Sequence, residues 1–192
     1  MKKVVIVHGW NGSPNSDWYK WLKNKLEEKG YEVEAPLMPD TAIPKIDQWI
    51  NKLDEISGNI NKNNYFIGHS IGCQAILRFL EKLSENVKIG GCIFVAGWFN
   101  LTDETWDEKF KYETAKPWIK KKINFDRIKK HCKKFIVINS NDDPYVPLSD
   151  TEIFKEKLDA EIIIVKNMGH ISGEDGVNEF PLLLNKIIEI SK

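Results

Sequence analysis

The sequence predicts an α/β protein whose sheet is mainly parallel, with about six strands and with helices on both faces. Short runs of β-branched residues alternate with longer amphipathic segments along most of the 192 residues, a pattern typical of β-α-β units. The first run, Lys3–Val7, is almost continuously apolar, as expected of a strand buried on both faces. A chain of this length can bury one sizeable core, so we expect a single domain over residues 1–192.

The N-terminal half supplies most of the predicted elements. Apolar side chains recur at helical spacing over residues 17–29, and Gly30 ends that helix. A second helix spans residues 43–56 and begins with Pro44, which is favourable in a first turn. We expect the strands of this half at 3–7, 31–35, 64–67 and 89–96, and its third helix at 70–83.

Residues 97–132 interrupt the alternation. They contain Trp98, Trp106 and Trp118 among many charged residues. We expect this segment to be a short lid or pocket wall, or a loop packed on the body of the protein. The alternation then resumes with strands at 135–139 and 161–165 and helices at 151–158 and 180–190.

Composition excludes several classes of function. The 28 basic and 28 acidic residues balance, so no net field favours a nucleic acid or a membrane surface as a partner. Three cysteines without C-x-x-C spacing indicate reduced, buried thiols rather than disulfides or a metal site. No apolar run reaches membrane-spanning length, and the chain begins directly with a strand. We therefore expect a cytoplasmic protein that needs no cofactor or metal.

The stretch "YFIGHSIGCQAIL" carries the strongest functional signal. It places Ser70 directly after a predicted strand and at the start of a helix, in the pattern G-x-S-x-G. A serine in a sharp strand-to-helix turn exposes its hydroxyl for nucleophilic attack, and the flanking glycines relieve crowding there. Ser70 could instead act only as a helix N-cap.

A carboxylate and a histidine follow two later strands. The loop "SNDDPYVP" offers Asp142 and Asp143, and the loop "KNMGHISG" offers His170. A serine nucleophile needs a neutral imidazole to take its proton and a carboxylate to orient that imidazole. The order Ser, Asp, His, each after a separate strand, is the order of the α/β-hydrolases. The residues alone leave both aspartates open as the acid.

Backbone amides must also stabilise the oxyanion. We expect one from Ile71, the residue after the nucleophile, and a second from Trp10 or Asn11 in the loop after the first strand. Trp98 and Phe99, just after the fourth strand, are the candidate pocket residues. Of the remaining histidines, we expect His8 to hold its loop by hydrogen bonds, His69 to pack behind the sheet edge, and His131 to lie at the surface.

These motifs together resemble the small serine hydrolases of the α/β-hydrolase fold, the family that includes YdeN and the retinoblastoma-binding serine hydrolases. The resemblance spans essentially the whole chain and rests on "VVIVHGWNGSPNSDWYKWL", "APLMP", "FIGHSIGCQAILRFL", "NSNDDPYVP" and "NMGHISGEDG". It implies a minimal α/β-hydrolase fold without a large cap. Matching the family pattern selects Asp143 as the acid, with Val146 and Pro147 behind it, and assigns Ser70 and His170 as nucleophile and base.

The resemblance implies hydrolysis of small carboxylic esters or amides, so the expected partner is a small-molecule substrate. The protein-binding name of one branch does not carry over, because this sequence has no L-x-C-x-E stretch. The competing hypothesis is a non-catalytic interaction module on the same scaffold, since fold does not fix function.

Overall fold

Six strands of the described chain form one sheet in the order β2-β1-β3-β4-β5-β6. Every neighbouring pair is parallel, which confirms the predicted α/β architecture. The computed structural model describes residues 1–106 and 109–192. The strands are β1 (Lys3–Val7), β2 (Glu32–Glu34), β3 (Asn64–His69), β4 (Gly91–Val95), β5 (Phe135–Ser140) and β6 (Glu161–Val165).

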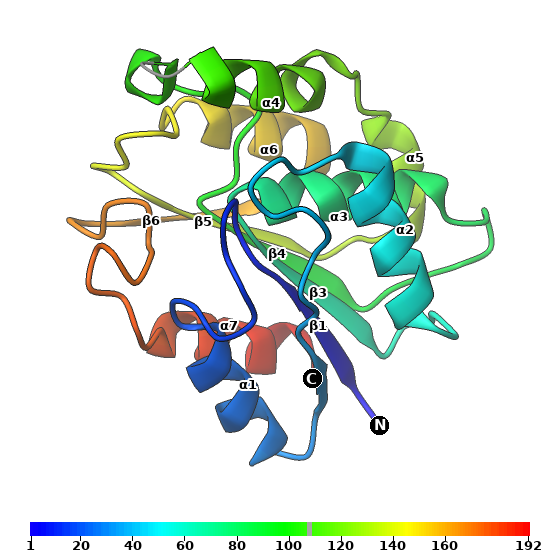
Figure 1. Ribbon diagram of the computed structural model, residues 1–192. Helices are drawn as coiled ribbons and strands as arrows, with labels where there is room; N and C mark the ends of the chain where they lie inside the picture. Colours follow the sequence, from blue (N-terminus) through cyan, green and yellow to red (C-terminus); the bar gives the residue numbers. More distant parts are fainter. Residues whose placement is uncertain (107–108) are drawn as a thin grey trace.

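Helices cover both faces of the sheet (Figure 1). On one face, α1 and α7 pack over a cluster that includes Val4 and Ile6 of β1. On the other face, α2, α3, α5 and α6 pack over a cluster that includes Val5 and Val7. The helices are α1 (Tyr19–Glu27), α2 (Ile46–Ser57), α3 (Ile71–Lys82), α4 (Lys109–Lys120), α5 (Phe125–His131), α6 (Asp150–Leu158) and α7 (Pro181–Ile190).

The strand order creates a switch point between β1 and β3. The chain leaves β1 toward α1 on one face and leaves β3 toward α3 on the opposite face. Loops that diverge in this way open a crevice beyond the carboxyl ends of the strands. The fold therefore places the loops after β1 and β3 side by side at the edge where ligands bind in such sheets.

Several element boundaries differ from the sequence expectation. The helix predicted from residue 17 begins at Tyr19, because Asp17 has a positive φ of 51° that a helix cannot include. The helix predicted from residue 43 begins at Ile46, so Pro44 precedes the helix instead of opening it. The segment 97–132 holds α4, α5 and a short 3₁₀ turn, Asp103–Trp106.

No helix in the described ranges is long and apolar enough to cross a membrane.

Two glycines allow α3 to pack directly against the sheet. A Cβ on Gly72 would lie 2.4 Å from the carbonyl oxygen of Val7, and a Cβ on Gly68 would lie 2.7 Å from the amide nitrogen of Cys73. Both obstacles are backbone atoms, which cannot rotate away as a flexible side chain can. The first turn of α3 can therefore approach β1 this closely only because residues 68 and 72 have no side chain.

Gly72→Ala should destabilise the protein by at least about 3 kcal/mol, because the added methyl group forces α3 away from β1. Chemical denaturation measures this change. Gly30→Ala is the matched control, since Gly30 has a φ of 83° and nothing within 4 Å of an added Cβ. Gly30→Ala should lower the free energy of unfolding by only about 1 kcal/mol, through backbone strain. Equal losses for the two variants would contradict the close-packing argument.

Candidate active site

The carboxyl edge of the sheet brings Ser70 and His170 to one pocket of about 560 Å³. Ser70 lies between β3 and α3, and His170 lies in the loop between β6 and α7. Asp143 follows β5 and contacts His170 from behind. Three residues far apart in sequence thus meet where the crossover topology predicts a binding site.

The backbone of Ser70 adopts a conformation that non-glycine residues avoid. Its φ is 52° and its ψ is −121°, a combination that costs about 1–3 kcal/mol. The Ser70 amide donates a hydrogen bond to the carbonyl oxygen of Val95 at 2.9 Å, which ties the turn to β4. Ser70 occupies the N-cap position of α3, but its side chain makes no capping hydrogen bond. The hydroxyl is therefore not used to cap the helix, which was the alternative reading of the sequence.

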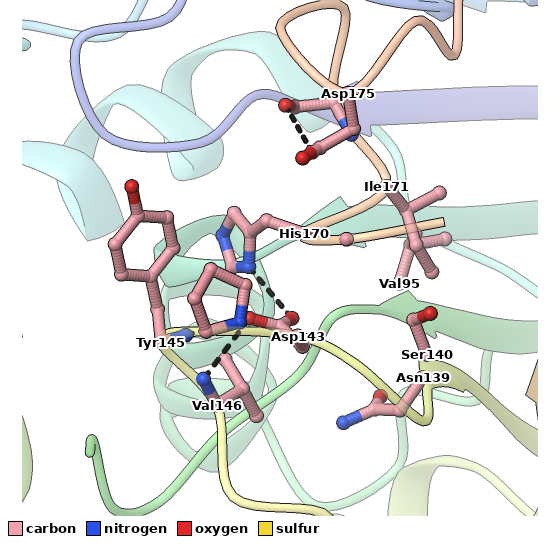
Figure 2. A network of polar contacts seen from close by, with 12 residues as sticks. Val95, Asn139, Ser140, Asp143, Tyr145, Val146, His170, Ile171 and Asp175 are labelled. Carbon is pink, nitrogen blue, oxygen red and sulfur yellow. Dashed lines mark hydrogen bonds and ion pairs between the residues drawn. The ribbon is translucent and has the colours of Figure 1, made fainter. Parts of the chain in front are cut away.

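Asp143 is held so that one carboxylate oxygen faces His170. Its Oδ2 lies 2.8 Å from His170 Nδ1, and its Oδ1 accepts hydrogen bonds from the amides of Tyr145 at 2.9 Å and Val146 at 3.1 Å. The Asp143 side chain is only 1% exposed. Figure 2 shows the carboxylate beside the imidazole, with the ring of Tyr145 alongside. This contact fixes the orientation of the imidazole and leaves its Nε2 for the pocket.

Asp142 binds different partners from Asp143. Its Oδ1 accepts hydrogen bonds from the Ser140 hydroxyl at 2.5 Å and from the amides of Met168 and Gly169, each at 3.1 Å. These bonds, the one from Ser140 first, lower the pKa of the Asp142 carboxyl. Asp142 therefore ties the end of β5 to the two residues that precede His170. The geometry separates the two aspartates that the sequence alone left open.

The expected oxyanion donors differ in availability. Ile71 begins α3, where helix geometry supplies no carbonyl partner four residues earlier for the amide. Trp10 lines the pocket, and its indole Nε1 donates to the carbonyl oxygen of Ala42 at 2.9 Å. The amide of Asn11, however, donates to the carbonyl oxygen of Thr41 at 3.0 Å. Asn11 also lines the pocket, but its amide already has a backbone partner, so Trp10 stays the predicted second donor.

The aromatic residues after β4 divide between the pocket and the core. Trp98 lines the pocket. Phe99 does not line it, because its ring packs against Phe154 at 4.4 Å between centroids, so we do not retain it as a pocket residue. Trp118 is buried and donates from its Nε1 to the carbonyl oxygen of Pro44 at 2.9 Å. The side chain of Trp106 lies outside the described residues.

The segment 97–132 contributes both to the pocket and to the body of the protein. Leu101 and Thr105 line the pocket. The far end of α4 is bound by Arg78 of α3, whose guanidinium donates to the carbonyl oxygens of Trp118 at 2.6 Å and Lys121 at 2.8 Å. This end of the segment is therefore fixed on α3 rather than standing over the pocket.

Two of the three remaining histidines differ from expectation. His8 behaves as predicted: its Nδ1 donates to the Gly9 carbonyl at 2.7 Å and its Nε2 accepts from the Met38 amide at 3.0 Å. His69 lines the pocket and lies below His170, with 5.1 Å between ring centroids, so the prediction that it packs behind the sheet edge is wrong. His131 is 1% exposed and bonds the Val87 carbonyl at 2.9 Å, so it is not a surface residue.

Sequence reasoning missed part of the pocket lining. Tyr145 lies with its ring edge toward His170, 5.3 Å between centroids; its place two residues after Asp143 in "DDPYVP" was a usable signal. Gly9 and Gly12 also line the pocket, in the loop that the sequence marked for the oxyanion. No local signal marked the others, because they come from loops that meet only in the fold. These others are Ser16, Asp17, Ser172, Gly173 and Glu174. The described part of the chain contains no cluster of three metal-ligating side chains.

The comparisons with known proteins cover nearly the whole chain. The model of the family described as serine hydrolase matches residues 4–188. YdeN of Bacillus subtilis, described as a hydrolase, is 30% identical over 188 residues, which cover 95% of this chain and 92% of YdeN. Its crystal structure has a TM-score of 0.90 at 28% identity and covers 99% of this chain and 98% of that one.

More distant relatives also match over most of the chain. The serine hydrolase RBBP9 of Rattus norvegicus is 27% identical over 177 residues, covering 90% of this chain and 89% of RBBP9. A structure from work on carboxylesterases of Nitrososphaera gargenis has a TM-score of 0.72 at 16% identity and covers 99% and 91% of the two chains. At that identity the likeness shows the fold alone.

His69 should make the stability of the protein depend on pH. Burial, and next the nearby charge of His170, lower the pKa of His69 from 6.5 to about 4. In the unfolded chain His69 takes up a proton below its ordinary pKa, whereas in the native protein it stays neutral until near pH 4. The free energy of unfolding should therefore fall by about 3 kcal/mol as the pH falls through this window.

Urea denaturation at a series of pH values checks this expectation. In His69→Gln the histidine contribution is absent, so the decline between pH 7 and pH 4 should be smaller by about 3 kcal/mol. The pKa of His8 is also lowered by burial, but His8 is present in both proteins and cancels in the comparison. Parallel stability curves for the two proteins would contradict the assignment.

Proposed function

The chain belongs to the serine hydrolase family, and from that membership we propose that it cleaves small carboxylic esters through an acyl-enzyme on Ser70. The match to the family model confirms the resemblance that the sequence motifs indicated, and membership of this family makes the protein a hydrolase. The observation that carries the finer proposal is the 2.8 Å contact of Asp143 with His170, in a pocket that also contains the strained Ser70.

In the proposed reaction, Ser70 Oγ attacks the acyl carbon while His170 Nε2 takes the hydroxyl proton. His170 can serve as base because its Nδ1 proton is directed to Asp143, so Nε2 carries the lone pair. The carboxylate then stabilises the imidazolium that forms. His170 next gives the proton to the leaving alcohol, which departs as the carbonyl re-forms.

Deacylation repeats the sequence with water as the nucleophile. His170 takes a proton from water, hydroxide adds to the acyl carbon, and the proton returns to Ser70 Oγ as the acid leaves. In both halves the negative charge on the acyl oxygen is stabilised by the amides of Ile71 and Trp10. Such preorganised donors are worth about 10²–10³ in kcat each, and the N-terminal end of α3 adds a favourable dipole.

The pocket supports a small substrate. Its volume of about 560 Å³ suits a short acyl chain or a single ring rather than a polymer. Trp10, Trp98 and Tyr145 give it aromatic walls, which favour an apolar acyl group. We propose esters as the preferred substrates and amides as the second class.

We also propose a cytoplasmic location, because free thiols persist in a reducing compartment. The three cysteines, Cys73, Cys92 and Cys132, are free and buried.

Ser70→Ala should lose essentially all turnover of p-nitrophenyl acetate and butyrate, by about 10⁴-fold or more, because the variant lacks the hydroxyl that attacks the acyl carbon. The variant should remain folded, since the Ser70 side chain makes no capping bond. Ester hydrolysis followed by absorbance, together with circular dichroism, measures both properties. Turnover retained by a folded Ser70→Ala protein would refute the assignment.

Asp143→Asn and Asp142→Asn should differ sharply. At position 143 the asparagine oxygen would accept from the Tyr145 and Val146 amides, so its NH2 group would face His170 Nδ1 and donate to it. The His170 proton would then lie on Nε2, which could no longer act as the base, so kcat should fall by about 10⁴-fold. At position 142 an asparagine keeps an oxygen that can accept from the Met168 and Gly169 amides, so the loss should stay within about tenfold. Steady-state kinetics decide the matter. Equal, mild losses would mean that Asp143 is not the acid.

A further inference from the structure

Three consecutive residues that lead into α1, Asp17 to Tyr19, hold the loop that carries His170. Asp17 Oδ1 accepts a hydrogen bond from the Gly173 amide at 2.6 Å. Trp18 Nε1 donates to the Ile171 carbonyl oxygen at 2.9 Å. The third residue, Tyr19, reaches the same loop through a histidine. Residues 17–19 thus hold one short loop that lies more than 150 residues further along the chain, two of them directly and the third through His69.

The link from Tyr19 to the loop passes through His69. The Tyr19 hydroxyl lies 2.6 Å from His69 Nδ1, and His69 Nε2 lies 2.9 Å from the carbonyl oxygen of His170. Because a carbonyl can only accept, His69 Nε2 carries the proton and Nδ1 accepts from the Tyr19 hydroxyl. The Tyr19 oxygen in turn accepts from the Gly9 amide at 3.2 Å, so every bond in the chain has a consistent donor and acceptor.

Burial makes these bonds costly to break. Trp18 and Tyr19 are 0% exposed and His69 is 3% exposed. A buried polar group that loses its partner bears its full desolvation cost, since water cannot replace the lost bond. The contacts therefore hold the backbone of the loop more firmly than equivalent contacts at the surface would.

The loop needs external bonds because its own backbone is strained. Ile171 has a φ of 55°, which is highly unfavourable for a β-branched residue. Asp142 holds the preceding residues from the β5 side through the amides of Met168 and Gly169. The contacts from His69, Trp18 and Asp17 begin at the His170 carbonyl and hold the following residues of the loop. His170 lies between the two sets of bonds.

We propose that Asp17, Trp18 and Tyr19, with His69 as intermediary, form an anchor that positions His170 against Ser70 and couples it to the loop bearing Trp10. The coupling runs through the Gly9 amide, which precedes Trp10 and shares the Tyr19 hydroxyl. This inference rests on the proposed function, because it assigns His170 as base and Trp10 as oxyanion donor. The anchor residues act through these groups and are positioning residues, not catalytic ones.

Tyr19→Phe tests the anchor by removing one oxygen atom. The buried ring is kept, while the Gly9 amide and His69 Nδ1 lose their shared partner. We expect kcat for p-nitrophenyl butyrate to fall about tenfold to hundredfold with KM within about twofold, because displacement of a catalytic group slows chemistry more than binding. The matched control is Tyr31→Phe, which also removes a hydroxyl hydrogen-bonded at 2.6 Å, there to Ser191. The control should keep wild-type kcat.

Amide hydrogen exchange supplies a readout that does not depend on activity. In Tyr19→Phe the amides of residues 168–173 should exchange at least about tenfold faster than in Tyr31→Phe, with the central strands unchanged. Unchanged exchange in this loop overturns the anchor, as does a kcat equal to that of the control. If ester turnover survives Ser70→Ala, the proposed function fails, and the exchange measurement alone then decides whether the anchor exists.

A pair of His69 variants separates positioning from packing. His69→Gln keeps an N–H donor that can reach the His170 carbonyl, whereas His69→Leu fills similar space without one. The glutamine variant should retain at least about fivefold more kcat than the leucine variant at similar KM. Equal kcat values in the two variants would overturn the role of His69 in the anchor.

Discussion

The close approach of α3 to β1 is the constraint on which the rest of the site depends. It exists because Gly68 and Gly72 present no side chain to the backbone atoms of the facing turn and of Val7. That approach forces Ser70 into its unfavourable conformation at φ 52°, since the chain must turn from strand to helix within one residue. The sheet stabilises the strained turn through the bond from Ser70 to Val95. The packing of the folded core stabilises this strained conformation. The Ser70 side chain lines the pocket and makes no capping hydrogen bond.

The strand order explains how a serine, an aspartate and a histidine from three different loops come together at one edge of the sheet. The chain leaves β1 and β3 toward opposite faces of the sheet, so the first residues of α1 and of α3 lie on either side of the same crevice. Ser70, the proposed nucleophile, immediately precedes α3, and residues 17–19, which lead into α1, hold the loop that carries His170. His69, the residue before Ser70, lies between them and bonds to both Tyr19 and the His170 backbone. The same edge of the sheet thus carries the candidate catalytic residues and the side chains that position them.

Much of this could be predicted from the sequence, and the failures share a cause. The strands, the parallel sheet and the grouping of Ser70 and His170 depend on local patterns: apolar runs, glycine positions and loop residues after strands. Asp142 and Asp143 could not be separated by local pattern alone, because their roles depend on which oxygen faces which loop. His131 looked like a surface residue because lysines precede and follow it, yet it is buried against Val87. Contacts between distant loops, such as Asp17 with Gly173, leave no periodic trace in the sequence.

Ser70 is the residue proposed to become acylated. The most direct measurement is peptide mass spectrometry of the protein after brief exposure to a fluorophosphonate probe, which reacts covalently with an activated serine. We expect one adduct, on the peptide that contains Ser70, and its loss when His170 is replaced by alanine. A folded protein that takes up no probe, or that carries the adduct on another serine, would show that Ser70 is not the nucleophile.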